Sequence, residues 1–558
     1  MLLLLFVSML QAQTDIPTDY FSNPLDIDLV LSGNFGEMRA NHFHSGLDFK
    51  TQQKEGLPIF APADGYVSRI QVQHYGYGKA LYILHPNGYT TVYGHLRSYA
   101  GEIEKYVKDT QYKKETFELE LFPDKALLPV KKGDIIAYSG NTGGSGGPHL
   151  HYEIRDSSQR PMNPLLFGVE IPDTQTPIIS AVFAYPIGED AHVDQSQNRT
   201  KLKLSKQKDG SYKAENITAF GKIGFGVTTY DQQNGASNKN GSYKIKATYN
   251  GDAKYEVLFN KFSFSETRYL NRYTDYNYYE TNKSMVQKLF REKNNPLSII
   301  TNEDENGYVT VVDSLNSFYN IQVEDFKGNS MLVSIPIEGK KMEIVDIKKV
   351  EKTDDYIYAD HATSITKGKF SIYIPANSLY DDTYLKIETN GDTLKFHEDL
   401  IPIHTNISIT TDVSEYNEAD KNSLYIGRLN SKGLPNYTST TRSGDKLTAK
   451  TRTFGNYVVA ADTTPPTVKP VNFSEDKWIS NQNFLQVKIT DDLSGISSYR
   501  ATINGKFILM EYEYKKNVLT YNFNDNVNLE SENNLKLIVI DNVGNSTTFE
   551  TKFFRKQP

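Results

Sequence analysis

Cysteine is absent from this chain of 558 residues. Without thiols there is no disulfide, no cysteine nucleophile and no thiolate metal ligand, so any metal must be held by histidines and carboxylates. The same absence excludes a lipid anchor on an acylated cysteine. A concentrated basic face is also missing, because the formal net charge is −7. We therefore predict no nucleic-acid partner, since phosphate binding needs dense positive charge.

Long apolar runs are scarce as well. The only candidate is the start, "MLLLLFVSMLQAQTDIP", which is too short to span a bilayer and is typical of a signal-peptide core. We predict a signal peptide over residues 1–12, cleaved after Ala12. No later segment is long and apolar enough to cross a membrane. The expected protein is therefore exported, soluble and not membrane-spanning, in the periplasm or outside the cell.

What the chain has in quantity is tyrosine, glycine and short alternating runs broken by DG, NG and GD turns. These features favour strands and tight turns, so the predicted fold class is mainly β. The length suggests three to five domains. The residue composition and pattern change along the chain and divide the mature protein into four β-domains, at 13–170, 171–339, 340–461 and 462–558.

The second and fourth domains form a weak internal repeat. "DTQTP" at 173 matches "DTTPP" at 462, "TTYDQQNG" at 228 matches "KITDDLSG" at 488, and "VEDFKGNS" at 323 matches "VIDNVGNS" at 539. Such patterning fits immunoglobulin-like sandwiches, the first enlarged by an insertion with a helix predicted around "NKSMVQKLFREKNN". The aspartates in these turns could bind calcium, but we interpret them as turn formers.

Histidines are concentrated near the N-terminus, where seven of the eleven precede residue 152. In "GPHLHYEIRD", His149 and His151 share one face of a predicted strand while Leu150 points into a core. In "NHFHSGLDFK", His44 and Asp48 share a face in the same way. Two histidines and one aspartate form a three-ligand set that leaves the fourth position of zinc open, as in catalytic sites.

A third element supplies acid–base chemistry. "TTVYGHLRS" places His95 at the end of an alternating strand, and His149 lies at the start of another. Hydrolysis at a zinc ion needs a base to take a proton from water and a donor to stabilise the oxyanion, and histidine can do both near neutral pH.

Together, "HSGLD", "YGHL" and "GPHLHYEIRD", with "KKGDIIAYSGNTGGSGG" between them, closely resemble the lysostaphin/LytM-type zinc metallopeptidases, which are bacterial cell-wall endopeptidases. The resemblance covers about residues 30–168. It implies a compact antiparallel β-domain, built as a duplicated hybrid motif, that holds one zinc ion. It also implies that His44, Asp48 and His151 bind zinc, that His149 is the general base, and that His95 stabilises the transition state.

The resemblance departs from the family in one place, a long charged insertion after His95 that could serve as a lid or a substrate wall. A peptidase followed by β-domains in an exported chain is similar to secreted Bacteroidetes-type members of the family. The expected function is a zinc metalloendopeptidase that cuts peptide crosslinks of peptidoglycan, so the expected partners are peptide stems. The crosslink bond is either a glycyl bridge or a D-alanyl–diaminopimelate bond.

Two other functions stay open. An inactive family member would bind and activate another cell-wall hydrolase, and would be expected to have lost zinc ligands. In the other, the C-terminal domains are adhesive or glycan-binding modules, with a protein or glycan partner of their own. Arg39 precedes the first predicted ligand and could meet a substrate carboxylate, but we interpret it as a solvated or structural arginine. Gly143, Gly144, Gly146 and Gly147 form a loop that either turns or contacts substrate.

Overall fold

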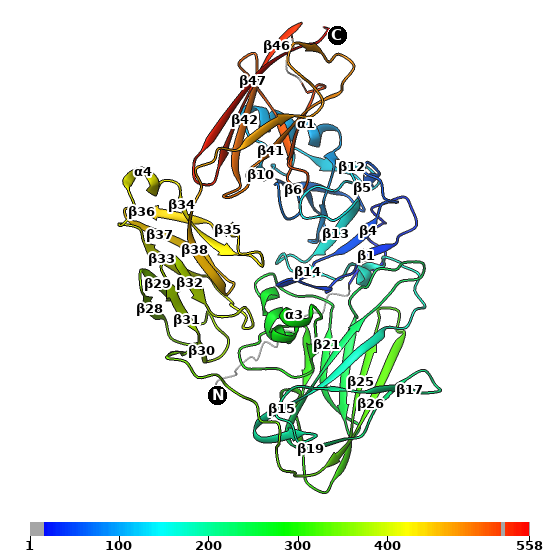
Figure 1. The fold of residues 1–558 in the computed structure, drawn as a ribbon. Coiled ribbons are helices and arrows are strands. Elements are labelled where there is room, and N and C mark those ends of the chain that lie inside the picture. Colours follow the sequence, from blue (N-terminus) through cyan, green and yellow to red (C-terminus); the bar gives the residue numbers. More distant parts are fainter. Residues whose placement is uncertain (1–15, 526–529, 557–558) are drawn as a thin grey trace, which may run out of the picture.

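The computed structural model of the protein describes residues 16–525 and 530–556. Strands dominate every region, so the prediction of a mainly β chain is confirmed (Figure 1). The predicted signal peptide, residues 1–12, lies outside the described residues. Within the described part of the chain, no helix combines the length and apolar character needed to span a membrane.

The N-terminal region contains an antiparallel sheet with strand order β1-β4-β13-β8-β7-β6-β10, to which β11 and β14 add at β6 and β13. A three-stranded sheet, β5-β12-β9, accompanies it. The elements of the region are β1 (Leu31–Gly33), β2 (Met38–Arg39), β3 (His42–Phe43), β4 (Leu47–Lys50), β5 (Pro58–Phe60), β6 (Gly65–Val72), β7 (Lys79–Leu84), β8 (Thr90–Gly94), β9 (Ser98–Tyr99), α1 (Gly101–Lys114), β10 (Leu119–Leu121), β11 (Pro129–Val130), β12 (Ile135–Tyr138), β13 (His149–Arg155), β14 (Pro161–Met162) and η1 (Pro164–Phe167).

The second region is built around one continuous sheet, with β19 pairing to β15 along most of its length and to β26 near its start. Its elements are β15 (Ile178–Val193), β16 (Thr200–Leu202), β17 (Leu204–Lys206), β18 (Tyr212–Ala214), β19 (Ile217–Tyr230), β20 (Lys244–Tyr249), β21 (Asp252–Leu258), η2 (Thr267–Tyr269), α2 (Leu270–Tyr273), α3 (Tyr276–Asn282), β22 (Gln287–Lys288), β23 (Ile300–Glu303), η3 (Glu305–Gly307), β24 (Val309–Val311), β25 (Asn316–Glu324) and β26 (Ser330–Gly339).

The third region packs two five-stranded antiparallel sheets face to face around a core of its own. Its elements are β27 (Asp355–Ile357), β28 (Thr363–Lys367), β29 (Phe370–Ile374), β30 (Thr383–Leu385), β31 (Ile387–Asn390), β32 (Thr393–Phe396), β33 (Ile407–Asp412), α4 (Glu418–Lys421), β34 (Leu424–Leu429), β35 (Pro435–Tyr437), β36 (Thr440–Ser443), β37 (Lys446–Thr451) and β38 (Gly455–Ala461).

The last region is a sandwich of a four-stranded and a five-stranded sheet, again with a separate core. Its elements are β39 (Thr467–Pro470), β40 (Lys477–Trp478), β41 (Phe484–Thr490), β42 (Ile496–Ile503), β43 (Lys506–Ile508), β44 (Met510–Glu513), β45 (Val518–Asn522), β46 (Glu532–Asp541) and β47 (Ser546–Phe554).

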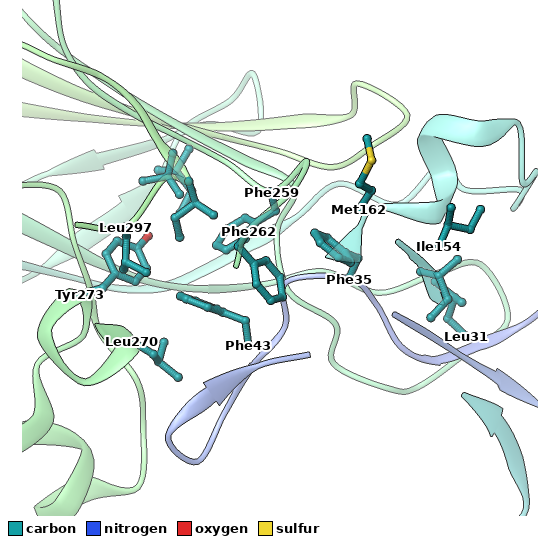
Figure 2. Packing of buried hydrophobic residues seen from close by; sticks show 14 of the residues in the cluster. Leu31, Phe35, Phe43, Ile154, Met162, Phe259, Phe262, Leu270, Tyr273 and Leu297 are labelled. Carbon is teal, nitrogen blue, oxygen red and sulfur yellow. The ribbon is translucent and has the colours of Figure 1, made fainter. Parts of the chain in front are cut away.

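The first two regions share a single hydrophobic core, which runs from Phe21 to Ile337. At their junction, Phe43 of β3 lies with its ring centroid 5.9 Å from that of Phe259 and 5.5 Å from that of Phe262. Figure 2 shows these rings meeting from the two sides of the junction. Buried aromatic rings contribute strongly to stability, so these contacts stabilise the junction between the two regions.

The insertion after His95 folds as β9, α1 and β10, and α1 docks against the last region of the chain (Figure 1). Lys108 forms an ion pair with Asp525 at 2.9 Å, and the Tyr112 hydroxyl donates to the same carboxylate at 3.1 Å. Arg500 pairs with Glu115 at the end of the helix. The insertion therefore serves as a docking platform for the C-terminal sandwich.

One predicted helix is wrong. The helix expected around "NKSMVQKLFREKNN" is not formed, because α3 ends at Asn282 and Lys283 takes a left-handed conformation with φ of 53°. Gln287 and Lys288 instead form β22, which pairs with β19. Tertiary pairing has overridden local helix propensity here.

Candidate active site

The strand predicted from "HLHYEI" is present as β13, which lies between β4 and β8 and brings side chains of all three strands together. His151 is the direct register partner of Asp48 on β4 and of Gly94 on β8. Because His149 and His151 lie two residues apart on β13, both face the same side, and Leu150 is fully buried on the other.

The predicted strand through "NHFHSGLD" is interrupted. β3 ends at Phe43 and β4 starts at Leu47, so His44 reaches the site from the link between them rather than from a common strand face. Gly46 is required in that link, because a Cβ there would lie 2.3 Å from the Tyr152 carbonyl oxygen on β13. The approach of the two backbones places His44 beside Asp48 despite the broken strand.

Three side chains converge into a compact ligand set. Asp48 Oδ1 lies 3.0 Å from His44 Nε2 and 2.8 Å from His151 Nδ1, and the two imidazole nitrogens are 3.0 Å apart. All three residues are buried. Two imidazoles and a carboxylate with ligand atoms this close together are a donor set that binds a transition metal.

The outer nitrogens of both imidazoles are held by oxygen acceptors. His44 Nδ1 donates to the Asn34 carbonyl oxygen at 2.7 Å, and His151 Nε2 lies 2.8 Å from Glu153 Oε1. Each ring therefore turns its other nitrogen toward the centre of the site, which is the arrangement that orients histidine ligands around a metal. The residues present thus fit a zinc ion by donor type and by orientation.

The other carboxylate oxygen of Asp48, Oδ2, accepts a hydrogen bond from the Arg39 guanidinium at 2.6 Å. This contact supports the interpretation of Arg39 as a structural residue. Glu153 is held in turn by Arg155, whose Nε donates to Oε2 at 2.6 Å. The ligands are therefore enclosed in a charged network with alternating signs.

This network sets the proton affinities of the site. Burial would disfavour the charged ring of His151, but its hydrogen bonds to Asp48 and Glu153 outweigh burial and raise its pKa to about 9. Burial would likewise raise the pKa of Glu153, but Arg155 and His151 hold that pKa well below its usual range. Burial lowers the pKa of His44. A metal must therefore displace a proton from His151 to bind at neutral pH.

His95 and His149 lie side by side over the ligand set, with ring centroids 4.7 Å apart. His95 Nδ1 is 2.8 Å from the Thr142 carbonyl oxygen, and His149 Nδ1 is 2.8 Å from the Gly147 carbonyl oxygen. Because a carbonyl oxygen only accepts, each Nδ1 carries a proton, and each ring in its neutral form has its lone pair on Nε2. His149 Nε2 lies 3.5 Å from Asp48 Oδ1.

The backbone at His95 is unusual. Its φ is 59°, in the left-handed region that non-glycine residues rarely occupy, and such strain persists where the surroundings impose it. Gly140 packs against this turn, because a Cβ at Gly140 would lie 2.7 Å from the His95 carbonyl oxygen. Burial, followed by the charges of His151 and His149, lowers the pKa of His95 to about 3, so its ring is neutral at physiological pH.

Asp48, His95 and His149 line a groove of about 620 Å³. One wall is formed by residues 144–147 of the glycine-rich loop predicted from the sequence, and other sides carry Arg39 and Lys50. Gly143 packs tightly against the backbone of Gly78, whereas a side chain at Gly146 or Gly147 would meet nothing within 4 Å. The first glycine is thus needed for packing, and the latter two keep the groove open.

The last region of the chain reaches this loop. Lys515 Nζ donates to the carbonyl oxygens of Asn141, Gly143 and Ser145 at 2.6, 3.2 and 3.1 Å. Tyr514 packs against Tyr75 beside it, with ring centroids 4.6 Å apart. The C-terminal sandwich therefore holds the outer side of the loop that forms the groove wall.

All five predicted site residues are brought together, and three supporting residues were missed in the sequence: Glu153, Asn34 and Lys515. Glu153 had a signal, because it is two residues beyond His151 and must share the face of His149 and His151 on a strand. No signal in the sequence pointed to Asn34 or Lys515. Asn34 contacts His44 through its main-chain carbonyl oxygen, and Lys515 is more than 360 residues away in sequence from the loop that it contacts.

Two family models match the chain. "Peptidase family M23" matches residues 42–112 and 125–164, so that the gap falls inside the insertion after His95. "Zu5-like domain" matches residues 354–462, the third region of the fold.

Individual relatives match the same N-terminal region. An uncharacterized metalloprotease of Haemophilus influenzae is 39% identical over 138 residues, which is 25% of this chain and 23% of that protein. The DD-carboxypeptidase/endopeptidase Mpg of Neisseria meningitidis serogroup B is 33% identical over 130 residues, 23% of this chain and 24% of that protein. The chain thus spans about a quarter of the length of these curated relatives.

Among solved structures, the catalytic domain of the antimicrobial peptidase lysostaphin from Staphylococcus simulans is 24% identical, with 25% of this chain and 90% of that chain covered and a TM-score of 0.19. The family match and the metalloprotease relatives show that the N-terminal region of the chain is a domain of peptidase family M23.

Proposed function

We propose that this chain, with its peptidase family M23 domain, is a zinc-dependent endopeptidase that hydrolyses the peptide crosslinks of peptidoglycan. The observation that carries the proposal is the convergence of His44, Asp48 and His151 into one ligand set beneath the paired rings of His95 and His149. A bound zinc ion would polarise the scissile carbonyl and increase the acidity of the attacking water.

His149 is the proposed general base. Its Nδ1–H is held by the Gly147 carbonyl oxygen, which leaves the lone pair of Nε2 directed at the ligand set. That nitrogen can accept the proton of the attacking water and later deliver it to the leaving amine. The Ser145 hydroxyl, 3.1 Å from Nδ1, helps to hold the ring in this orientation.

His95 is the proposed stabiliser of the transition state. Its Nδ1–H is bound to the Thr142 carbonyl oxygen, so Nε2 has no proton to donate while the ring is neutral. Because the proton that His149 takes from water goes to the leaving amine, His95 would have to take a further proton from solvent before it could donate to the oxyanion. The strained backbone at His95 supports a functional role for this position.

For the substrate, we propose a D-alanyl–diaminopimelate crosslink. The relative from Neisseria is named as a DD-carboxypeptidase/endopeptidase, which favours this bond over a glycyl bridge. Arg39 is paired with Asp48 and Glu37, so the cationic side chain in the groove that suits a free carboxylate of a stem peptide is Lys50. A peptidoglycan substrate also fits an exported protein, in the periplasm or outside the cell.

The competing proposal is an inactive protein that activates another hydrolase. It predicts that the metal ligands have been lost. Such a protein has no need to keep three ligands and their orienting partners Asn34 and Glu153 in place. The third proposal, that the C-terminal β-domains bind a protein or a glycan, is compatible with peptidase activity and remains a prediction.

The test is mass spectrometry of crosslinked muropeptides incubated with the mature protein, with and without a zinc chelator. We expect chelator-sensitive conversion of dimers to monomers, with masses that identify the bond. His149→Ala should lower kcat by about 10²–10⁴-fold and keep its metal. His42→Ala, which changes an exposed histidine near the same motif, is the control. A zinc-loaded protein that leaves every dimer intact would contradict the proposal.

A further inference from the structure

The three motifs of the internal repeat meet in space. In the second region, Asp173 lies in the segment before β15, Asp231 directly follows β19, and Asp325 directly follows β25. Their carboxylates offer oxygens within 4.8 Å of one another. Asp231 and Asp325 are buried, with 6% and 4% of their surface exposed. Three carboxylates repel one another at such distances, and burial weakens the screening of that repulsion.

These carboxylates line a cavity of about 40 Å³. Two buried oxygens in its wall, Asp231 Oδ1 and Asn240 Oδ1, have no hydrogen-bond partner among the residues that the structure describes. Asn240 is only 4% exposed and carries no charge, so it is an observation separate from the acidic cluster. A buried oxygen without a partner is costly, and the cavity is large enough to hold an ion.

The turn that carries Asp325 keeps its shape by its own hydrogen bonds. The backbone nitrogen of Asn329 donates to Asp325 Oδ1 at 2.9 Å, and Asn329 Nδ2 donates to Oδ2 at 2.6 Å. Asp325 is therefore a turn former, as expected from the sequence. Asp231 is different, because its Oδ1 is buried without a hydrogen-bond partner among the described residues and Asp231 lines the cavity.

We propose that Asp173, Asp231, Asp325 and Asn240 bind a calcium ion in this cavity. The four proposed ligands offer carboxylate and amide oxygens, which suit a hard cation, and they include none of the histidine nitrogen or cysteine sulfur ligands that zinc prefers. Calcium is favoured over magnesium because calcium accepts irregular shells made of protein oxygens, whereas magnesium demands near-octahedral geometry and retains its waters.

The proposed ion lies at the junction with the peptidase domain, whose Leu31, Asn34 and Phe35 line the same cavity. Asp231 and Asn240 pair through both backbone hydrogen bonds and close the loop between them. Next to Asn240, Gly241 exchanges two hydrogen bonds with the side chain of Asn34, at 2.6 and 2.8 Å. The Asn34 carbonyl oxygen in turn accepts from His44 Nδ1. The calcium site thus fixes a loop that positions a ligand of the catalytic metal.

The fourth region repeats the pattern. Asp462, Asp491 and Asp541 form a second group of carboxylates, and Asn545 bonds to Asp541 as Asn329 bonds to Asp325. Both copies of the internal repeat therefore bring three aspartates together, so the cluster is a feature of the repeat. It also means that the ion count of the first site must be measured as a difference between variants.

The test is calcium titration of the full mature chain after treatment with chelator and dialysis. Calcium alone is added up to about 5 mM, above the dissociation constants of about 0.1–1 mM found in extracellular calcium modules. We expect Asp231→Asn to bind one ion fewer per chain than the wild type. Asp209→Asn, which alters an exposed turn aspartate of the same region, is the matched control and should bind as the wild type does.

Asn240→Ala tests the site without changing its charge, and should weaken calcium binding at this site at least about tenfold. Calcium should also slow hydrogen exchange in the segment 231–241 of the wild type, and magnesium at equal concentration should do so much less. The proposal is overturned if the wild type binds no calcium, if Asp231→Asn and the wild type bind equal numbers of ions, or if magnesium has the same effect.

Discussion

His151 and Asp48 are direct register partners on the neighbouring strands β13 and β4, and their side chains meet at 2.8 Å between Nδ1 and Oδ1. Residues opposite each other in an antiparallel pair have their side chains on the same face of the sheet. The ladder itself therefore aligns two of the proposed zinc ligands, and a register shift of one residue would send them to opposite faces.

The carboxylate behind His151 should control metal affinity. Glu153→Gln removes the negative charge from the acceptor of His151 Nε2 while keeping its size. We expect zinc to bind about 10–100-fold more weakly, because such supporting contacts raise ligand basicity and fix the ring. Competition with a zinc chelator measures the change. Glu170→Gln, at an exposed position of the same domain, should match the wild type.

Zinc binding should release a proton. The pKa of His151 is raised to about 9, so the metal-free ring is protonated at pH 7.5 and must become neutral to bind zinc. Zinc affinity should consequently rise with pH up to about 9 and level off above it. Calorimetry in buffers of different ionisation enthalpy counts the released protons. An affinity that stays constant between pH 6.5 and 9 would contradict this assignment.

The contact between the C-terminal sandwich and the groove should affect catalysis from a distance. Lys515→Met removes the ammonium that bridges the carbonyl oxygens of Asn141, Gly143 and Ser145. Charge-assisted hydrogen bonds contribute about 1.5–3 kcal/mol each, so we expect a looser loop and a kcat/KM reduced by about tenfold. Zinc content should not change. Lys516→Met, at the next exposed position, is the control, and equal rates for the two variants would refute the contact's role.

The shared core predicts that the peptidase domain and the second region unfold together. Phe43→Ala deletes a ring that is 2% exposed and packs on Phe259 and Phe262, and should lower the free energy of unfolding by about 3–5 kcal/mol. Denaturant unfolding followed by hydrogen exchange at two probes, peptides from β13 of the peptidase domain and from β19 of the second region, should give coincident midpoints. Phe318→Ala, at a ring that is 50% exposed, should change stability by less than about 0.5 kcal/mol. Separate midpoints for the two probes would contradict a common core.

Local pattern predicted the elements that depend on alternation. β13 follows from "HLHYEI", and His95 directly follows β8 as "TTVYGHL" predicts. The pattern failed at "NHFHSGLD", where the close approach of Tyr152 to Gly46 breaks the strand, and at "NKSMVQKLFREKNN", where pairing with β19 replaces a helix. Both failures come from contacts with residues far away in the sequence, which no local window contains.

The sequence by itself determined the ligand types, the pair of histidines on one strand face and the repeat of aspartates, because each depends on residue identity and short spacing. Tertiary structure alone decided that Asn34 and Glu153 orient the ligands, that Lys515 holds the groove wall, and that Asp173, Asp231 and Asp325 enclose one cavity. The physical reason is that orientation, burial and mutual repulsion depend on distances between side chains, and those distances are set by strand pairing and core packing across segments remote in the chain.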